Sequence, residues 1–261
     1  MKLVTWNVNS LGARLPRVLE FLALERPDVA CLQETKTAAD AFPAAELRAA
    51  GYEAVHHSAG RWAGVAILAR EGLELGDPSS GLPGELNADE ARWIEATVGG
   101  LRVASVYVTN GRAVGTPTFD EKLAFLEAMA TRAAQVAASG TPLLIAGDFN
   151  VTPADVDVYD PAAFVGETHV TPDERSRLEA VIEAGGLVDA FRAMHGPDEV
   201  GFTWWDYRQG HFHRRMGLRI DLVLLAEALA PRLTRCGIVR DFRKGKKPSD
   251  HAPLVVEWTG S

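Results

Sequence analysis

An acid and an amide lie two residues apart in the run Gly147-Asp148-Phe149-Asn150, directly after the apolar residues 143–146. In an extended chain, side chains two apart face the same way, so Asp148 and Asn150 would point at one ligand while Phe149 points into the core. The alternative is an ordinary turn after a buried strand, because glycine, aspartate and asparagine are common turn residues. The other strand ends of the chain favour the first interpretation.

Polar residues also mark the ends of other apolar runs. Asn7 follows the first predicted strand, Glu34 follows the second, and Tyr107 ends a later one. Asp250 and His251 immediately precede the last predicted strand. Each has an ordinary alternative: the asparagine could be a turn residue, the glutamate a surface charge and the tyrosine a half-buried strand residue. Together they are rich in oxygen ligands, which suit Mg²⁺ or Mn²⁺, whereas zinc would want more histidine or cysteine.

One acid interrupts a predicted strand. Asp221 stands between the apolar residues Ile220 and Leu222. A buried carboxylate must find a partner or shift its pKa, and His251 is the partner to consider. Such a pair raises the pKa of the imidazole and fixes its tautomer, which suits a protonated group that faces a phosphate.

Composition limits the class of protein. The chain has 261 residues, 47% hydrophobic and 24% charged, and no Pro/Ser-rich linker, so we expect residues 1–261 to form a single domain. The formal net charge of -8 gives no general sign of nucleic-acid binding, so phosphate contacts would depend on a metal or on local basic segments. Two such segments exist, although either could be a solvated loop. The first contains Arg208, His211, His213, Arg214, Arg215 and Arg219, and the second contains Arg240, Arg243, Lys244, Lys246 and Lys247.

The cysteines and the apolar runs indicate the setting of the protein. Cys31 and Cys236 are the only cysteines, too few for a disulfide scaffold or a zinc site. The amino terminus lacks a long apolar signal segment, and no run approaches the ~20 apolar residues of a membrane span. We therefore expect a soluble, cytoplasmic monomer with no membrane association.

The remaining patterns predict a mixed order of helices and strands. Helices are predicted over 15–24, 44–50, 119–138 and 172–183, the last preceded by a capping box at Thr171. Strands are predicted over 3–6, 28–32, 52–56, 64–68, 92–98, 101–108, 220–225, 233–239 and 254–258. The Gly99-Gly100 pair predicts a hairpin turn. This irregular order favours two packed β-sheets with helices outside them.

Seven short segments run through the chain in this order: Trp6-Asn7-Val8-Asn9, Leu32-Gln33-Glu34-Thr35-Lys36, Gly147-Asp148-Phe149-Asn150, Gly186-Leu187-Val188-Asp189, Phe202-Thr203-Trp204-Trp205-Asp206-Tyr207-Arg208, Gly217-Leu218-Arg219-Ile220-Asp221 and Pro248-Ser249-Asp250-His251-Ala252-Pro253. In order and approximate spacing, from residue 1 to about residue 258, they resemble the motifs of the exonuclease III family of apurinic/apyrimidinic endonucleases. The resemblance implies a four-layer α/β sandwich like that of deoxyribonuclease I, with two mixed β-sheets flanked by helices.

The resemblance also implies a role for each polar residue. Glu34 would hold the metal directly, with Asn7 and Asp250 helping directly or through water. Asp148 would orient and deprotonate the attacking water, whose position Asn150 would fix. Whether one or two metals act is left open.

The implied phosphate contacts involve three further residues. His251, paired with Asp221, would bind the non-bridging oxygen, and Tyr107 would contact the phosphate or support the leaving group. The implied reaction is Mg²⁺-dependent hydrolysis, with Mn²⁺ as an alternative, of the phosphodiester 5′ to an abasic site. It leaves a 3′-hydroxyl, and 3′ to 5′ exonuclease and 3′-phosphodiesterase activities accompany it. Double-stranded DNA with abasic sites or blocked 3′ ends would be the partner and would associate the protein with the nucleoid.

Residues 202–221 resemble the part of the family that separates DNA repair from other phosphoesterases. Trp204 and Leu218 fall where an apolar pocket accepts a flipped-out, base-less deoxyribose. Trp205 and Ile220 are further candidates, although Trp205 could equally be a core aromatic. DNA contacts are also predicted for Asn110, Arg112, Arg208 and Arg219. The family usually has proline where this chain has Thr109, which leaves open the conformation of the loop that carries Asn110 and Arg112.

Two other functions fit parts of the pattern. A phosphoesterase of the same fold that acts on lipid or inositol phosphates would share the polar core, but it has no evident use for residues 204–219. A DNA-binding relative without catalysis would lack one of the residues that bind the metal or the phosphate, whereas every expected acid and the histidine are present in this sequence.

Overall fold

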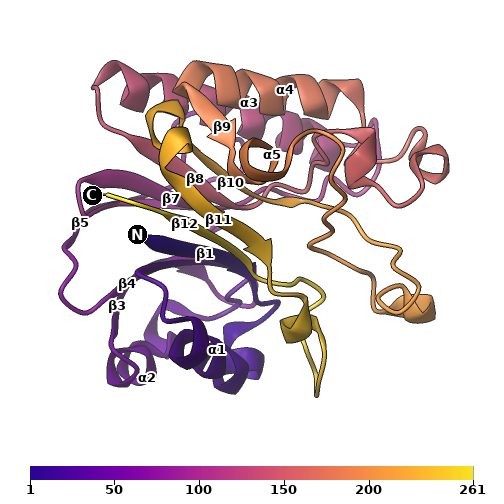
Figure 1. Cartoon of the computed structure of the whole chain (residues 1–261). Helices are drawn as coiled ribbons and strands as arrows, with labels where there is room; N and C mark the ends of the chain where they lie inside the picture. The colour runs from indigo at the N-terminus through magenta and orange to yellow at the C-terminus, as the bar shows by residue number, and fades with distance from the viewer. Residues whose placement is uncertain (261) are drawn as a thin grey trace.

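Two six-stranded β-sheets pack face to face in the computed structural model, which describes residues 1–260 (Figure 1). In the first sheet the strand order is β11-β12-β1-β2-β4-β3, with β11 (Leu233–Ile238), β12 (Leu254–Trp258), β1 (Lys2–Asn7), β2 (Val29–Gln33), β4 (Trp62–Arg70) and β3 (Tyr52–Ala59). In the second the order is β5-β6-β7-β8-β10-β9, with β5 (Leu75–Ser80), β6 (Trp93–Val98), β7 (Leu101–Tyr107), β8 (Leu143–Asp148), β10 (Asp221–Ala226) and β9 (Leu187–Asp189).

Helices cover the outer faces of both sheets (Figure 1). The first sheet carries α1 (Leu11–Glu25) and α2 (Ala44–Ala49), and the second carries α3 (Pro117–Ala138) and α4 (Pro172–Gly185). The short α5 (Ala190–His195) packs beside β10 and β11. Short 3-10 helices span Ala39–Ala41, Asp155–Asp157, Pro161–Phe164, Arg208–Gly210, Glu227–Arg232 and Arg240–Arg243.

Three apolar clusters hold these layers together. One lies between the sheets and contains Leu3 and Ile67 of the first sheet and Val103 and Val223 of the second. A second joins the second sheet to α3 and α4, and a third joins the first sheet to α1 and α2. Burial of these apolar faces is the main stabilising contribution. The predicted four-layer sandwich is therefore confirmed.

The predicted helices and strands are all present, with ends shifted by a few residues, and the Gly99-Gly100 hairpin joins β6 to β7. Helix α1 begins at Leu11 rather than at residue 15, because the Ser10 hydroxyl caps it by accepting a hydrogen bond from the Ala13 amide. Three elements were not predicted: β5, β9 and α5. Strand β5 lies at a sheet edge, is mostly exposed and contains proline, and the other two are very short, so none has a clear apolar period.

The central strands bring the polar residues to one end of the sandwich. The ends of the parallel neighbours β1 and β2 place Asn7 beside Gln33, which precedes Glu34. In the second sheet Asp148 is paired with Tyr107 of β7 on one side and with Asp221 of β10 on the other. Gly147 allows β8 to lie this close to β7, because a Cβ at position 147 would lie 2.0 Å from the Val106 carbonyl oxygen.

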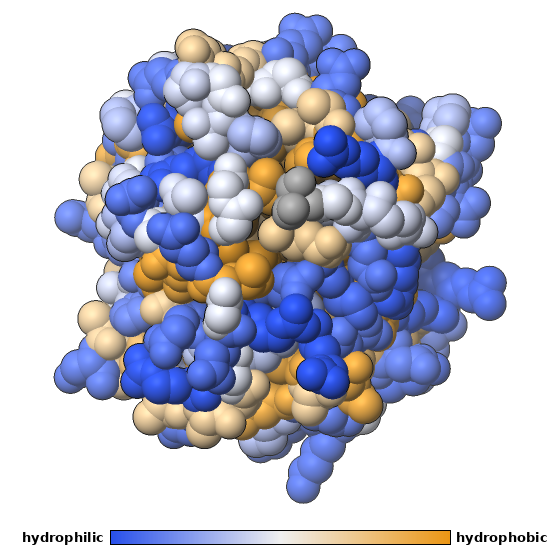
Figure 2. Space-filling view, turned by 60° about the vertical axis from the view of Figure 1, so that its left-hand side comes forward, coloured by the Kyte–Doolittle hydropathy of each residue, from blue (hydrophilic) through white to orange (hydrophobic). Residues whose placement is uncertain are grey.

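The opposite end of the sandwich carries both chain termini (Figure 1). Figure 2 shows that hydrophilic residues surround the apolar areas of the surface at that end. Within residues 1–260, no helix combines the length and the apolar character that a bilayer crossing needs.

Candidate active site

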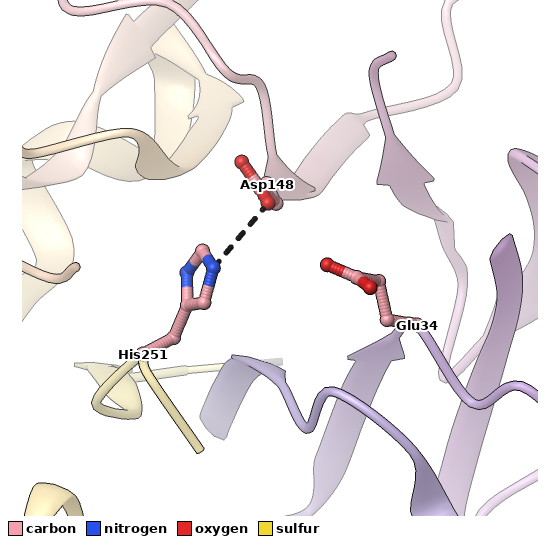
Figure 3. A group of neighbouring side chains, drawn as sticks. All are labelled: Glu34, Asp148 and His251. Carbon is pink, nitrogen blue, oxygen red and sulfur yellow. Dashed lines mark ion pairs between the residues drawn. The ribbon is translucent and has the colours of Figure 1, made fainter. Parts of the chain in front are cut away.

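Three residues from separate parts of the chain converge at the polar end of the sandwich (Figure 3). Glu34 follows β2, Asp148 ends β8, and His251 comes just before β12. Their ligand atoms all lie within 4.8 Å of one another, and the His251 Nε2 lies 3.7 Å from the Asp148 Oδ2. These residues, here called the catalytic group, could hold a metal ion.

Asn7 connects the two carboxylates of the catalytic group. Its Nδ2 donates hydrogen bonds to the Glu34 Oε1 at 2.7 Å and to the Asp148 Oδ2 at 2.9 Å. Its Oδ1 accepts a hydrogen bond from the Asn9 amide at 3.0 Å. Asn7 therefore positions the two carboxylates. Its Oδ1 is the atom that would coordinate a metal directly, and in this structure that oxygen accepts a hydrogen bond from the Asn9 backbone amide.

The predicted pair of Asp221 and His251 is present. The His251 Nδ1 lies 2.8 Å from the Asp221 Oδ2, and both side chains are buried. Burial alone would lower the pKa of His251, but the carboxylates of Asp221 and Asp148 outweigh it and raise that pKa to about 10. The imidazole is therefore protonated at neutral pH, with Nδ1–H donated to Asp221 and Nε2–H on the side of Asp148.

Asp148 and Tyr107 also have shifted pKa values. Burial raises the pKa of Asp148 to about 7, although the His251 charge and the Asn7 hydrogen bond oppose the shift. A cation bound beside it would lower this pKa again. Burial and the nearby Glu34 and Asp148 charges raise the pKa of Tyr107 well above its ordinary value. Tyr107 is thus a neutral O–H donor at the edge of the site.

Asp250 lies outside the catalytic group. Its Oδ1 accepts a hydrogen bond from the Asn9 Nδ2 at 3.0 Å, and its Oδ2 accepts one from the Trp204 Nε1 at 3.1 Å. The structure places this acid between a loop and the tryptophan, and the predicted metal contact of Asp250 stays a prediction.

Lys36 was not expected in the site. Its Nζ lies 2.6 Å from the Glu34 Oε2 and 2.7 Å from the Asn9 Oδ1. Glu34 and Lys36 both have left-handed backbone conformations, with φ of 51° and 50°, and such values concentrate at functional sites. The signal in the sequence was the lysine two residues after Glu34 in the same short segment.

Asn150 corrects the expectation of an extended strand. Its φ is 50°, and its amide donates a hydrogen bond at 2.9 Å to the Asp148 Oδ1, as in an Asx turn. Its Nδ2 donates to the Val108 carbonyl oxygen at 2.8 Å, and its Oδ1 lies 3.1 Å from the His169 Nε2. The idea that Asp148 and Asn150 point together at one ligand is therefore wrong, because the strand ends at Asp148 and the chain turns.

A buried ion pair supports this turn and was also missed. The Lys122 Nζ donates to the Asn150 carbonyl oxygen at 2.7 Å and forms a salt bridge with Glu174, and both charged side chains are fully buried. Burial and the Lys122 charge lower the pKa of His169 to about 3, so this imidazole stays neutral. The sequence contained one sign of it, because Lys122 lies one helical turn before Leu126 on the apolar stripe.

Trp204, Leu218 and Ile220 come together in one apolar cluster beside Asp250. Trp204 is partly exposed, whereas Leu218 and Ile220 are buried under it. Trp205 points the other way and packs with Phe212 and Ala252, so its predicted place in the sugar pocket is wrong. Neighbouring residues in an extended segment face opposite sides, which explains the difference.

The predicted DNA contacts divide into two kinds. Arg219 is fully buried, and its guanidinium lies 2.6 Å from Asp157 and 2.7 Å from Asp189, so its predicted contact with DNA is wrong. Arg208 is exposed and bound to Asp206 at 2.5 Å. Asn110 and Arg112 are exposed and line a cavity of about 400 Å³ that also reaches Glu34 and Tyr107. Contacts of these three residues with DNA stay predictions.

Known proteins are similar to this chain in sequence and in fold. Residues 4–251 match the model of the Endonuclease/Exonuclease/phosphatase family, and the chain belongs to this family. It is 32% identical to an exodeoxyribonuclease III of Haemophilus influenzae, over 99% of this chain and 100% of the relative.

Two solved structures are also similar to it. The 3′ phosphatase NExo from Neisseria bound to a product DNA hairpin is 38% identical and covers 100% of both chains with a TM-score of 0.95. An AP endonuclease from Archaeoglobus fulgidus is 33% identical and covers 99% of both chains with a TM-score of 0.93. The predicted fold and family resemblance are thereby confirmed.

Proposed function

We propose that this chain is a metal-dependent DNA repair nuclease of the exonuclease III type. It hydrolyses the phosphodiester 5′ to an abasic site and leaves a 3′-hydroxyl, with 3′ to 5′ exonuclease and 3′-phosphodiesterase activities on blocked ends. The observation that carries the proposal is the buried Asp148 carboxylate held between Asn7 and the charged His251. The names of the similar proteins, which include an exodeoxyribonuclease III, a 3′ phosphatase and an AP endonuclease, support the choice of DNA.

The donor set suits a hard cation, and we propose Mg²⁺, with Mn²⁺ as the alternative. His251 is protonated and offers no lone pair at Nε2, so the Glu34 carboxylate would hold the ion, and Asp148 would face the attacking water. When bound, the cation neutralises phosphate charge and stabilises the charge that develops in the transition state.

The remaining steps belong to the protein. Asp148 accepts the proton of the attacking water, and a cation bound nearby favours the ionised form of this buried carboxylate that the role requires. The His251 Nε2–H donates to a non-bridging phosphate oxygen, and Asp221, bound at Nδ1, keeps the imidazole protonated and oriented. Tyr107 stays protonated and can donate its hydroxyl to the phosphate or to the leaving oxygen.

Selection of an abasic sugar is assigned to the apolar cluster. Trp204 is one of its partly exposed members, and its indole donates a hydrogen bond to Asp250, one residue before His251. A deoxyribose without its base is small and apolar enough to lie against such a surface, whereas an attached base adds polar bulk.

The direct test uses a duplex oligonucleotide with a single tetrahydrofuran abasic analogue. With Mg²⁺ we expect one incision on the 5′ side of the analogue and a 3′-hydroxyl end, and we expect chelator to stop the reaction. An undamaged duplex of the same sequence is the control. Absence of incision by pure protein across Mg²⁺ and Mn²⁺ would overturn the proposal. Release of phosphate from small lipid or inositol substrates would then favour the related phosphoesterase.

A further inference from the structure

A cavity of about 430 Å³ lies outside the catalytic group, between two exposed loops. One loop contains Tyr207, Phe212 and His213, and the other runs from Arg243 to Pro248. In Figure 1 these are the orange and yellow loops that project from the end of the molecule remote from both termini. We call this cavity the loop pocket.

Arg243 is the unusual residue of the loop pocket. Its side chain is only 7% exposed, and its guanidinium carbon lies 4.9 Å from the Tyr207 ring centroid and 5.2 Å from that of Phe212. Its Nη2 donates to the Trp205 carbonyl oxygen at 3.2 Å, whereas its buried Nε has no hydrogen-bond partner within residues 1–260. Two aromatic rings and one carbonyl group therefore hold the Arg243 guanidinium in a fixed orientation.

The charges around Arg243 leave the loop pocket positive. Within the described chain Arg243 forms no salt bridge, although Asp206 also lines the pocket. The Asp206 carboxylate is bound to Arg208, and Lys244, which pairs with the exposed Asp241, adds a second cation. The nearby Asp250 charge opposes the cost of burying this guanidinium without bonding to it, and an anion in the pocket would reduce that cost further.

The loop pocket and the catalytic group share one segment of chain. Tyr207 donates its hydroxyl to the Pro248 carbonyl oxygen at 2.8 Å, and the Trp205 amide donates to the Asp250 carbonyl oxygen at 3.0 Å. His251 follows Asp250 directly. A ligand in the loop pocket would therefore lie next to the segment that leads to His251. It would not contact Glu34, Asp148 or His251 themselves.

We propose that the loop pocket binds a phosphate of the DNA backbone, at a position other than the phosphate that is cleaved. The fixed guanidinium supplies positive charge to the lining of the pocket, and Lys244 adds a second positive charge there. The identity of the ligand as DNA rests on the proposed function. The pocket would then give this acidic protein a local anchor for a polyanion and would set affinity and salt dependence.

The test compares Arg243→Met with Arg235→Met. Both remove one positive charge, but Arg235 lies on β11 and pairs with Glu25 and Glu257, away from the loop pocket. Dissociation constants of a duplex are measured by fluorescence anisotropy without metal at several salt concentrations. We expect Arg243→Met to weaken binding about tenfold at low salt and to reduce the slope of log K against log salt by about 0.9, as for one lost phosphate contact. Arg235→Met should keep the slope of the parent protein.

A second variant guards against misfolding. If Arg243→Met shows a lowered melting temperature, the exposed Lys244→Met is measured in its place, again with Arg235→Met as control, and a loss of affinity and of slope is expected for Lys244→Met alone. An unchanged slope in a folded pocket variant overturns the inference. The proposed function fails separately: a parent protein that binds DNA but never incises it overturns that function, while the salt slopes still decide the loop pocket.

Discussion

The catalytic group and the loop pocket are both polar, but they are built in opposite ways. Glu34, Asp148 and His251 are delivered by strand ends and are joined to neighbours such as Asn7 by short hydrogen bonds. The loop pocket is made by exposed loops around a cation that forms no salt bridge within residues 1–260. The groups proposed to act in the chemical step are therefore held in place before DNA binds, whereas the groups proposed to attract DNA include a cation with no salt-bridge partner among the described residues.

The largest expected effect separates chemistry from binding. Asp148→Asn removes the proton acceptor, so we expect incision to fall by about 10³-fold or more while the dissociation constant for DNA stays within about threefold. Single-turnover incision and anisotropy measure the two quantities. Turnover equal to that of the parent protein would remove Asp148 from the base role, and a parallel loss of binding would mean that the two regions are not separate.

The buried support of the catalytic end is tested next. Lys122→Met leaves Glu174 charged, buried and without its partner, so we expect a loss of about 3–5 kcal/mol in the free energy of unfolding. Urea denaturation measures it, and adding Glu174→Gln to Lys122→Met should restore part of the loss, because the buried charge is removed while the amide oxygen still accepts a hydrogen bond from the local backbone amides. Arg48→Met breaks the exposed pair with Glu53 and should leave stability unchanged. Equal stability of Lys122→Met and Arg48→Met would contradict the importance of the buried pair.

The charge on His251 can be tested through pH. Asp221→Asn removes the main cause of the raised pKa of His251, so the imidazole should lose its proton at lower pH. Because the proposed mechanism needs the protonated form, the alkaline limb of the incision profile should move to lower pH. We also expect a loss of about 10²-fold in turnover near neutral pH. An alkaline limb at the same pH in both proteins would show that His251 is not the titrating donor.

The smallest effect concerns the two adjacent tryptophans. Trp204→Ala should reduce the preference for the abasic analogue over an undamaged site by about tenfold, because the partly exposed face of the apolar cluster is lost. Trp205→Phe is the control, since Trp205 packs against Phe212 in a separate cluster. Competition between damaged and undamaged duplexes measures the preference. If both variants change it equally, the two tryptophans do not differ as the structure indicates.

Much of the fold could be predicted from local patterns. Apolar alternation and the capping box at Thr171 gave elements that the structure contains, and Asp221 in an apolar strand indicated its partner His251. These signals are local because an apolar period or a single misplaced charge is visible in a short window.

Other parts of the site depend on contacts between distant segments. Arg219 looked like a DNA contact, but its partners Asp157 and Asp189 lie 62 and 30 residues away and enclose it in the interior. Asn150 has a left-handed backbone conformation, and its amide donates a hydrogen bond to the Asp148 side chain. The spacing of apolar residues does not indicate a turn of this kind. Tertiary packing determines the partners of Arg219 and the conformation of Asn150, and the local sequence pattern does not contain that information.

The hydrogen bond from Asn7 to Asp148 also crosses from one sheet to the other, and that from His251 to Asp221 joins the segment before β12 to the second sheet. Each sheet therefore carries only part of the proposed catalytic site. The apolar interface between the sheets serves as an alignment surface, on which a small sliding movement would change the separation of the reacting groups. Incision rate should consequently report on the mutual register of the two sheets, even for substitutions deep in the sandwich that alter neither charge nor overall stability.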